Sequence, residues 1–478
     1  MIVKLCFSMF VPFAIGFFLM HILLSFKSSV SENLLLKSSL ALGLGFGITS
    51  CTYFLCLLLF GPAMTGIILS EAGILGFLMI FFIYAIKTRT SSVYDMEHEK
   101  TLNDLKLRRI LSVGFFTVLA LAVTNIFYRA ILLPHGIWDA WCIWNLRARF
   151  IFRGGKYWTD AFSSMLAPNH HPDYPLLIPL TVSRCWTYIG NETEAVPWLL
   201  SLLFAFATAG ILYSALAVLR SKSQGMIASM LLFSTPIFIN VGSWQQADIP
   251  TAFFFLTGIV FLFFQDRFPD NYGFSAFAGV MTGLSGWTKN EGLLFLASFF
   301  LARIVTIIIS KNRKILMKQL VYFALGVLPV LAIIIYFKVN FVPPNDLVSG
   351  ERGIDEIILK LKDYSRYVQI LKTFLTGIIV FFPHVLLLVF CALYFGFNIY
   401  DKIKTSILTS LLVMIFSMTG YFMTYLITPY ELSWHLRFSY DRLVLQLWPS
   451  FLLIYFIIVR TPEEAFLNSK IEVTEKII

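Results

Sequence analysis

Long apolar segments alternate with short polar segments along almost the whole chain. Roughly thirteen apolar windows follow one another, near 5–24, 38–60, 64–86, 110–133, 194–219, 226–243, 249–264, 273–288, 292–309, 319–337, 373–396, 405–427 and 443–459. About twenty apolar residues in a helix suffice to cross a hydrocarbon core of roughly 30 Å. The pattern therefore predicts an all-α polytopic membrane protein with roughly thirteen transmembrane helices and a long polar loop after the fourth.

The composition supports a membrane location. Hydrophobic residues make up 58% of the 478 residues and charged residues only 13%, whereas about a quarter of the residues in a soluble domain are charged. The net charge of +10 is accounted for by basic loops, which accumulate on the cytoplasmic side of membrane proteins. We therefore expect membrane lipids, and no nucleic acid, among the partners of this chain.

The distribution of Lys and Arg predicts an orientation. Short basic loops lie at 87–109, 220–222, 311–318 and 402–404, and the tail carries two more Lys. With thirteen crossings, these loops share the cytoplasmic face if the N-terminus is outside. The remaining polar segments then share the extracytoplasmic face, and these are 134–192, 245–250, 289–291, 338–372 and 429–442.

The six cysteines do not indicate a metal site or a disulfide framework. They are scattered, lie mostly inside apolar windows and form no CxxC pair. We expect most of them to be buried as small apolar side chains. Cys142 differs because it lies in the polar segment after the fourth window.

A carboxylate and several tryptophans follow the fourth window. Asp139 stands in Trp138-Asp139-Ala140-Trp141, within a few residues of the predicted membrane boundary. Ionisable residues at membrane depth are costly and usually functional, and a carboxylate here could act as a general base. The alternative is that Asp139 caps the following helix while Trp138 and Trp141 belong to an interfacial aromatic belt.

The same polar segment continues into His170-His171-Pro172-Asp173-Tyr174-Pro175. His170, His171 and Asp173 could bind a divalent metal ion or hydrogen-bond a polar substrate. The prolines predict a rigid loop before a short helix, so a purely structural loop is an equal alternative.

Three charged residues lie at predicted helix starts on the same face. Asp248 stands in Ala-Asp-Ile-Pro, where it could serve chemistry or simply cap a helix. Lys289 and Glu291 lie between two apolar windows. They could form an ion pair in a tight turn, or Lys289 could hold a lipid phosphate.

The last polar segment contributes His435, Arg437 and Arg442. A guanidinium presents a fixed fork of donors that matches phosphate oxygens. Arg442 could therefore bind a phosphate, or its side chain could reach the lipid headgroups without a specific ligand.

Taken together and in this order, these segments resemble the membrane glycosyltransferases of the GT-C fold. The closer likeness is to a bacterial branch related to protein O-mannosyltransferases, lipid A aminoarabinose transferases and lipopolysaccharide-core galacturonosyltransferases. It covers roughly residues 110–460, which we expect to form the catalytic membrane core. Residues 1–109 would then be additional N-terminal helices with a basic cytoplasmic loop, and 461–478 a cytoplasmic tail.

The resemblance implies an inverting transfer of a hexose or pentose from a polyprenyl-phosphate donor to a lipid, glycan or protein acceptor. In the family pattern, Asp139 would deprotonate the acceptor hydroxyl, and Lys289, Arg442 and Arg437 would stabilise the lipid phosphate. His170, His171, Asp173 and Asp248 would hold the acceptor or a divalent metal ion. Trp138, Trp141, Glu291 and His435 would support the site, which is expected to face the periplasm from a bacterial inner membrane.

Two other classes of function remain at this stage. A flippase or transporter for a lipid-linked glycan would need polar residues along its crossings, and few are present apart from Glu71 and Arg303. A ligase or polymerase of preassembled glycans would need a larger acceptor site, which the long segment 338–372 could provide.

Overall fold

The computed structural model describes residues 1–24, 33–87, 105–166, 170–345 and 354–465. Within these ranges the chain is helical and contains no strand, only a single bridge between Phe397 and Val459. The all-α polytopic fold predicted from the apolar windows is therefore confirmed. Residues 88–104 of the predicted basic loop and the tail lysines lie outside the described residues, whereas Lys87 ends α3 and residues 105–109 begin α4.

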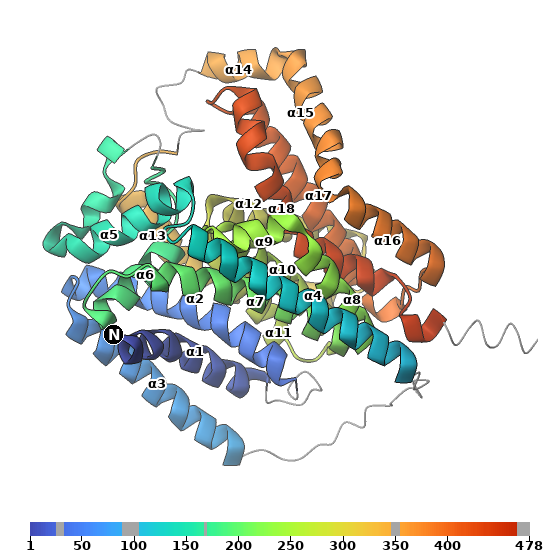
Figure 1. The fold of residues 1–478 in the computed structure, drawn as a ribbon, viewed down its shortest axis with the longest axis horizontal. Helices are drawn as coiled ribbons and strands as arrows, with labels where there is room; N and C mark the ends of the chain where they lie inside the picture. Colours follow the sequence, from blue (N-terminus) through green and yellow to red (C-terminus); the bar gives the residue numbers. More distant parts are fainter. Residues whose placement is uncertain (25–32, 88–104, 167–169, 346–353, 466–478) are drawn as a thin grey trace, which may run out of the picture.

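In the described part of the first half of the chain there are nine α-helices, which Figure 1 labels α1 to α9. They are α1 (Ile2–Leu24), α2 (Leu34–Phe60), α3 (Met64–Lys87), α4 (Leu105–Leu132), α5 (Asn145–Arg153), α6 (Leu177–Ile189), α7 (Ala195–Leu219), α8 (Lys222–Ser234) and α9 (Pro236–Ser243).

Nine further α-helices are described in the second half. They are α10 (Asp248–Arg267), α11 (Gly273–Thr288), α12 (Asn290–Ile309), α13 (Arg313–Asn340), α14 (Ile354–Lys362), α15 (Tyr364–Thr376), α16 (Phe382–Phe395), α17 (Lys404–Ile427) and α18 (Leu432–Ile458).

The number of spans is lower than the roughly thirteen predicted. Eleven helical segments of the described chain are long and apolar enough to cross a membrane, or twelve if α8 and α9 form one broken span. These two helices meet at an angle of 69°. Pro236 explains the break, because proline lacks the N–H that would continue α8 and forces Thr235 out of the helical region.

Helix α11 accounts for the other difference. Its sixteen residues reach only about 24 Å at 1.5 Å per residue, less than the hydrocarbon core. Its ends nevertheless meet opposite ends of α10: the ring of Phe274 lies 5.7 Å from that of Phe268, and Lys289 contacts Asp248. Helix α11 therefore runs back along the length of α10.

Helix α10 forms the centre of the bundle. Its entire apolar window is buried, and it packs against α7, α11 and α18. Figure 1 shows α1, α2 and α3 together on one side of the bundle, and α14, α15 and α16 on the opposite side. Asp248 is the first residue of α10. The central helix therefore places a carboxylate at the end of the bundle where α10 begins.

The polar segments gather at that end, as predicted. Contacts join residues from 134–192, 245–250, 289–291, 338–345 and 429–442. The polar segment 338–372 also contains α14 and most of α15, whose Lys360 and Arg366 donate to carbonyl groups at the end of α17. We call this end of the bundle the polar face.

Candidate active site on the polar face

Arg442 connects three polar segments that are far apart in the sequence. Its Nη1 donates to Oδ2 of Asp139 and, at 3.3 Å, to Oε1 of Gln246. The same nitrogen lies 3.9 Å from Oδ2 of Asp248. The side chains of Arg442 and Asp139 are 19% and 25% exposed, so this ion pair lies where solvent and the bundle interior meet.

Asp248 links Arg442 to a second cation. Its Oδ1 accepts from Nζ of Lys289 at 2.9 Å and from Nε2 of Gln446 at 2.7 Å. Nζ of Lys289 also lies 2.7 Å from Oε1 of Glu291. Burial opposes the charged form of Lys289, but the two carboxylates outweigh it and raise its pKa from the usual 10.5. A continuous chain of alternating charges therefore runs from Asp139 to Glu291.

These contacts decide between the local interpretations that the sequence left open. Asp139 occupies the N-cap position of the π-helix Ala140–Trp144, but its side chain makes no capping hydrogen bond. Asp248 is not at a cap position, because the N-cap of α10 is Ala247. The predicted ion pair between Lys289 and Glu291 is present, but Lys289 also holds Asp248.

A second polar group surrounds Asp173. Its Oδ2 accepts from Nδ2 of Asn290 at 2.8 Å and from Nδ2 of Asn345 at 2.6 Å. Nζ of Lys338 lies 3.7 Å from the same oxygen and donates to Oδ1 of Asn290 at 2.8 Å. Asn290 stands between Lys289 and Glu291, so the tripeptide 289–291 joins both polar groups.

Aromatic rings and a buried arginine lie beside Asp173. The ring of His171 stacks on that of Tyr174 at 4.8 Å, and Tyr174 stacks on Trp144 at 5.6 Å. Arg147 donates to the carbonyl of Tyr174, and its guanidinium lies 5.2 Å from the Trp144 ring. Burial lowers the pKa of Arg147 to about 10 and raises that of the Tyr174 hydroxyl well above 10. Arg147 remains a cation at neutral pH.

The remaining predicted residues lie at the edge of this arrangement. Nδ1 of His170 lies 3.1 Å from Sγ of Cys142, and His435 contacts the hydroxyl of Thr428 at 2.8 Å. The exposed rings of Trp138 and Trp141 pack on each other at 4.5 Å.

Arg437 is separate from the charged chain. It is exposed, and its guanidinium lies over Phe438. Five residues along an α-helix turn the side chain by about 140°, so Arg437 and Arg442 leave α18 in different directions. Arg437 therefore lies apart from the cations that contact Asp139 and Asp248.

Backbone geometry also marks this region. Among the described residues other than glycine, positive φ angles occur only at His171, with 42°, and Gln245, with 59°. Asp139 precedes a π-helix, Ala140–Trp144. Strained residues and π-helical turns are concentrated at functional sites, so both observations agree with a site on the polar face.

Several buried polar atoms here have no hydrogen-bond partner among the described residues. They include Nε of Arg442, Nε2 of Gln246, Oε2 of Glu291, Nη2 of Arg147 and Oδ1 of Asn145. Leaving a buried polar group unsatisfied costs about 1–3 kcal/mol. Such atoms are suited to a polar ligand, since they offer three donors and two acceptors.

A divalent metal ion has no evident set of ligands in the described part of the chain. No three side chains of His, Cys, Asp or Glu gather there at coordinating distance. Asp139, Asp173 and Asp248 are each paired with a cation instead.

Several polar residues of the site were given no role from the sequence, among them Arg147, Gln246, Lys338 and Gln446. Lys338 and Gln446 lie in apolar helices, α13 and α18. Their position in such helices was the available signal, because a polar residue is costly there unless it faces a partner.

Comparison with known families supports a class of protein. Residues 172–337 match the family model described as dolichyl-phosphate-mannose-protein mannosyltransferase. The match covers about a third of the chain and includes Asp173, Asp248, Lys289 and Glu291, but neither Asp139 nor Arg442. No curated protein and no solved structure matched the chain.

The match and the all-helical fold indicate a multi-pass membrane glycosyltransferase of the GT-C type. More particularly, the matched segment is similar to mannosyltransferases that use a lipid-linked sugar.

Proposed function

We propose that this protein is an inverting glycosyltransferase that moves a sugar from a polyprenyl-phosphate carrier to an acceptor hydroxyl. The transfer would take place at the polar face, turned toward the periplasm from a bacterial inner membrane. The observation that carries the proposal is the position of Arg442, which bonds Asp139, lies beside Asp248 and has an unpartnered, buried Nε.

Asp139 is the proposed general base. It accepts the proton of the acceptor hydroxyl as that oxygen attacks the anomeric carbon, and the bond from this carbon to the phosphate oxygen breaks on the opposite side. The leaving group is polyprenyl phosphate, whose negative charge grows during the step. Arg442 and Lys289 stabilise this charge, because preorganised cations are most effective where charge develops in the transition state.

The ion pair between Arg442 and Asp139 links donor binding to the base. A phosphate at the unpartnered Nε edge draws the guanidinium toward itself and weakens the bond between Nη1 and Asp139. Asp139 then becomes a better proton acceptor when the donor is in place. In the absence of donor, the ion pair with Arg442 makes the Asp139 carboxylate a weaker proton acceptor.

Glu291 and Gln246 would contact the sugar. Oε1 of Glu291 is paired with Lys289, but its buried Oε2 has no partner. A carboxylate oxygen repels phosphate and accepts hydrogen bonds from hydroxyls. Glu291 therefore suits a sugar hydroxyl, whereas Nε2 of Gln246 can donate to either the sugar or the phosphate.

The acceptor would enter beside Asp173, Lys338 and the stacked His171 and Tyr174. Its class, whether lipid, glycan or protein, is open to screening.

Donor turnover tests the proposal without knowledge of the acceptor. Purified protein in lipid would be incubated with a short-chain polyprenyl-phosphate hexose, and release of polyprenyl phosphate by transfer to water or to a membrane extract would be measured. Wild-type protein should release it, and Asp139→Asn should not. Absence of release by folded wild-type protein over a panel of hexoses and pentoses would refute the assignment.

A further inference from the structure

Helix α3 is held against the bundle by few side chains. Among its residues with described side chains, only Ile67, Glu71 and Leu78 are buried. In a bilayer, apolar burial does not drive helices together, because the lipid is as apolar as the side chains. The position of α3 therefore depends strongly on its polar contacts, and Glu71 supplies the strongest of them.

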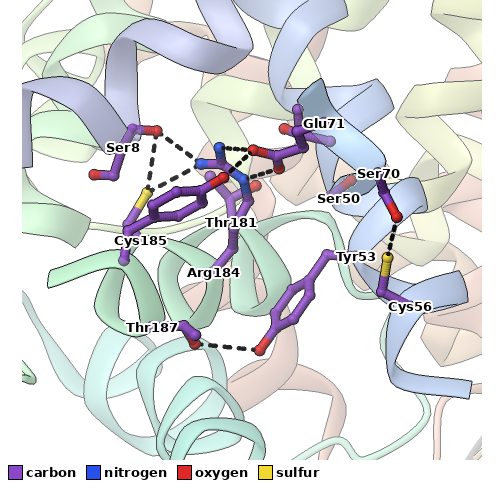
Figure 2. A network of polar contacts seen from close by, with 12 residues as sticks. Ser8, Ser50, Tyr53, Cys56, Ser70, Glu71, Thr181, Arg184, Cys185 and Thr187 are labelled. Atoms are coloured by element: carbon purple, nitrogen blue, oxygen red, sulfur yellow. Dashed lines mark hydrogen bonds and ion pairs between the residues drawn. The ribbon is translucent and has the colours of Figure 1, made fainter. Parts of the chain in front are cut away.

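Glu71 forms a buried ion pair with Arg184 of α6 (Figure 2). Nε and Nη2 of Arg184 donate to the two carboxylate oxygens, the second at 2.6 Å. The hydroxyl of Tyr188 donates to Oε2 at 2.6 Å, and Nη1 of Arg184 donates to the carbonyl of Ser8 at 2.7 Å. One guanidinium thus joins α1, α3 and α6.

Helix α2 adds polar contacts to both α6 and α11. The hydroxyl of Tyr53 lies 3.3 Å from that of Ser183 and 3.4 Å from that of Thr187. Nε1 of Trp287 donates to the hydroxyl of Ser50 at 3.1 Å. The first three helices therefore contact α6 and the last turn of α11 through hydrogen bonds.

Two glycines let α2 approach the helices that carry the charged chain. A Cβ at Gly47 would lie 2.4 Å from Cδ1 of Leu284 on α11, and one at Gly43 would lie 2.0 Å from the ring of Phe253 on α10. A Cβ at either position would force the neighbouring Leu284 or Phe253 side chain to move. Helix α2 is therefore packed directly against the two helices that place Asp248 and Lys289.

The anchored segments adjoin both polar groups of the site. Helix α6 begins four residues after Asp173, and Trp287 precedes Lys289 by two residues. We propose that α1, α2 and α3 form a positioning frame for the active site, with Glu71 and Arg184 as its main positioning residues. This inference rests on the proposed function and replaces the expectation that residues 1–109 are an addition outside the catalytic core.

Energetics favour a role in geometry over one in stability. Burying an ion pair costs desolvation, and replacement of such a pair by apolar residues is often neutral or stabilising. The pair between Glu71 and Arg184 is fully hydrogen-bonded, so it fixes the rotation of both helices. An apolar pair would fill a similar volume, but in a bilayer it would fix neither the position nor the rotation of α3.

The test compares two matched double variants of the full-length protein in lipid. Glu71→Met with Arg184→Met removes the frame contact. Arg220→Met with Glu464→Met removes an ion pair of 3.0 Å, far along the bundle from the polar face, in which the arginine also bonds a backbone carbonyl. Thermal unfolding, donor turnover and amide hydrogen exchange of peptides covering 170–176 and 286–291 would be measured for each.

We expect the frame variant to keep a melting temperature close to that of the wild type. Its exchange in both peptides should rise about tenfold because local opening is easier, and kcat should fall at least about tenfold with little change in phosphate binding. The control variant should show wild-type hydrogen exchange in both peptides and a wild-type kcat. Unchanged exchange in a folded frame variant would overturn the inference.

Two further outcomes are distinguishable. If the frame variant does not fold, Glu71→Gln takes its place, and unchanged exchange at 170–176 in that variant overturns the inference. If exchange responds as expected but wild-type protein turns over no donor, the frame stands and the proposed glycosyltransferase function fails.

Discussion

Replacement of Asp139 by Asn separates the two roles that the site gives to this residue. The amide has nearly the same shape as the carboxylate, but it carries no charge and cannot accept the acceptor's proton. Arg442, which bonds Asp139 in the free protein, would lose its closest anionic partner. We therefore expect slower chemistry together with tighter binding of the donor phosphate.

The contacts of Asp139 allow estimates of how Asp139→Asn changes stability, rate and donor affinity. The ion pair is partly exposed on both sides, so its loss should cost only about 0–1 kcal/mol of stability. Loss of a general base typically lowers the rate about 10²- to 10⁴-fold. A phosphate at Nε and Asp139 at Nη1 would share one guanidinium and lie roughly 6–8 Å apart, which gives a repulsion of about 2–3 kcal/mol at an effective dielectric of 20. Solvent at Asp139 reduces this value, and we expect donor affinity to rise about three- to tenfold.

Two assays check this expectation on the same preparation. Binding of a labelled short-chain polyprenyl phosphate gives the affinity, and donor turnover gives the rate. A folded Asp139→Asn variant that binds the phosphate more weakly than wild type would refute the competition for Arg442. A variant that retains turnover would refute the role of Asp139 as base.

Three further predictions follow from the same contacts. Glu291→Gln should raise the KM for a donor with a neutral sugar and improve turnover of a donor whose sugar carries a carboxylate. Competition between the two donors measures this, and an unchanged ratio of their turnover would contradict the contact between Glu291 and the sugar. Lys338→Met should lower donor turnover to an acceptor extract about tenfold or more while leaving phosphate binding within about twofold, and loss of phosphate binding would place Lys338 in the donor site instead. Because the pKa of Lys289 is raised from 10.5, its contribution to stability should be present below about pH 10 and be lost only as the pH rises through the raised pKa. The difference in unfolding free energy between wild type and Lys289→Met should therefore be constant from pH 6 to 9, and a decline within that interval would contradict the pairing.

The fold was largely predictable because its signal is local. Apolar windows identify helices irrespective of their partners, and α7 and α12 lie within a few residues of the predicted windows. The error in the number of spans also has local causes, the break at Pro236 and the shortness of α11. Parity of the crossings placed the polar segments together, and the contacts between Arg442, Asp139 and Asp248 confirm this grouping.

The pairing of side chains was not predictable in the same way. Glu71 was noticed as an isolated acid within an apolar window, but its partner Arg184 lies 113 residues away. Lys338 and Gln446 likewise become site residues only because α13 and α18 turn them toward the polar face. Such choices depend on helix rotation, which a single sequence does not specify when most faces are apolar.

The most direct test of the account is the binding of a labelled short-chain polyprenyl phosphate to the purified protein in lipid. Wild type would be compared with Arg442→Ala and with Arg437→Ala, a control on the same helix whose side chain is exposed and separate from the charged chain. We predict saturable binding by wild type and by Arg437→Ala, and a loss of about 2–5 kcal/mol of binding free energy in Arg442→Ala. Equal binding by all three proteins, or no binding by folded wild type, would contradict the assignment of Arg442 as the residue that binds the lipid phosphate.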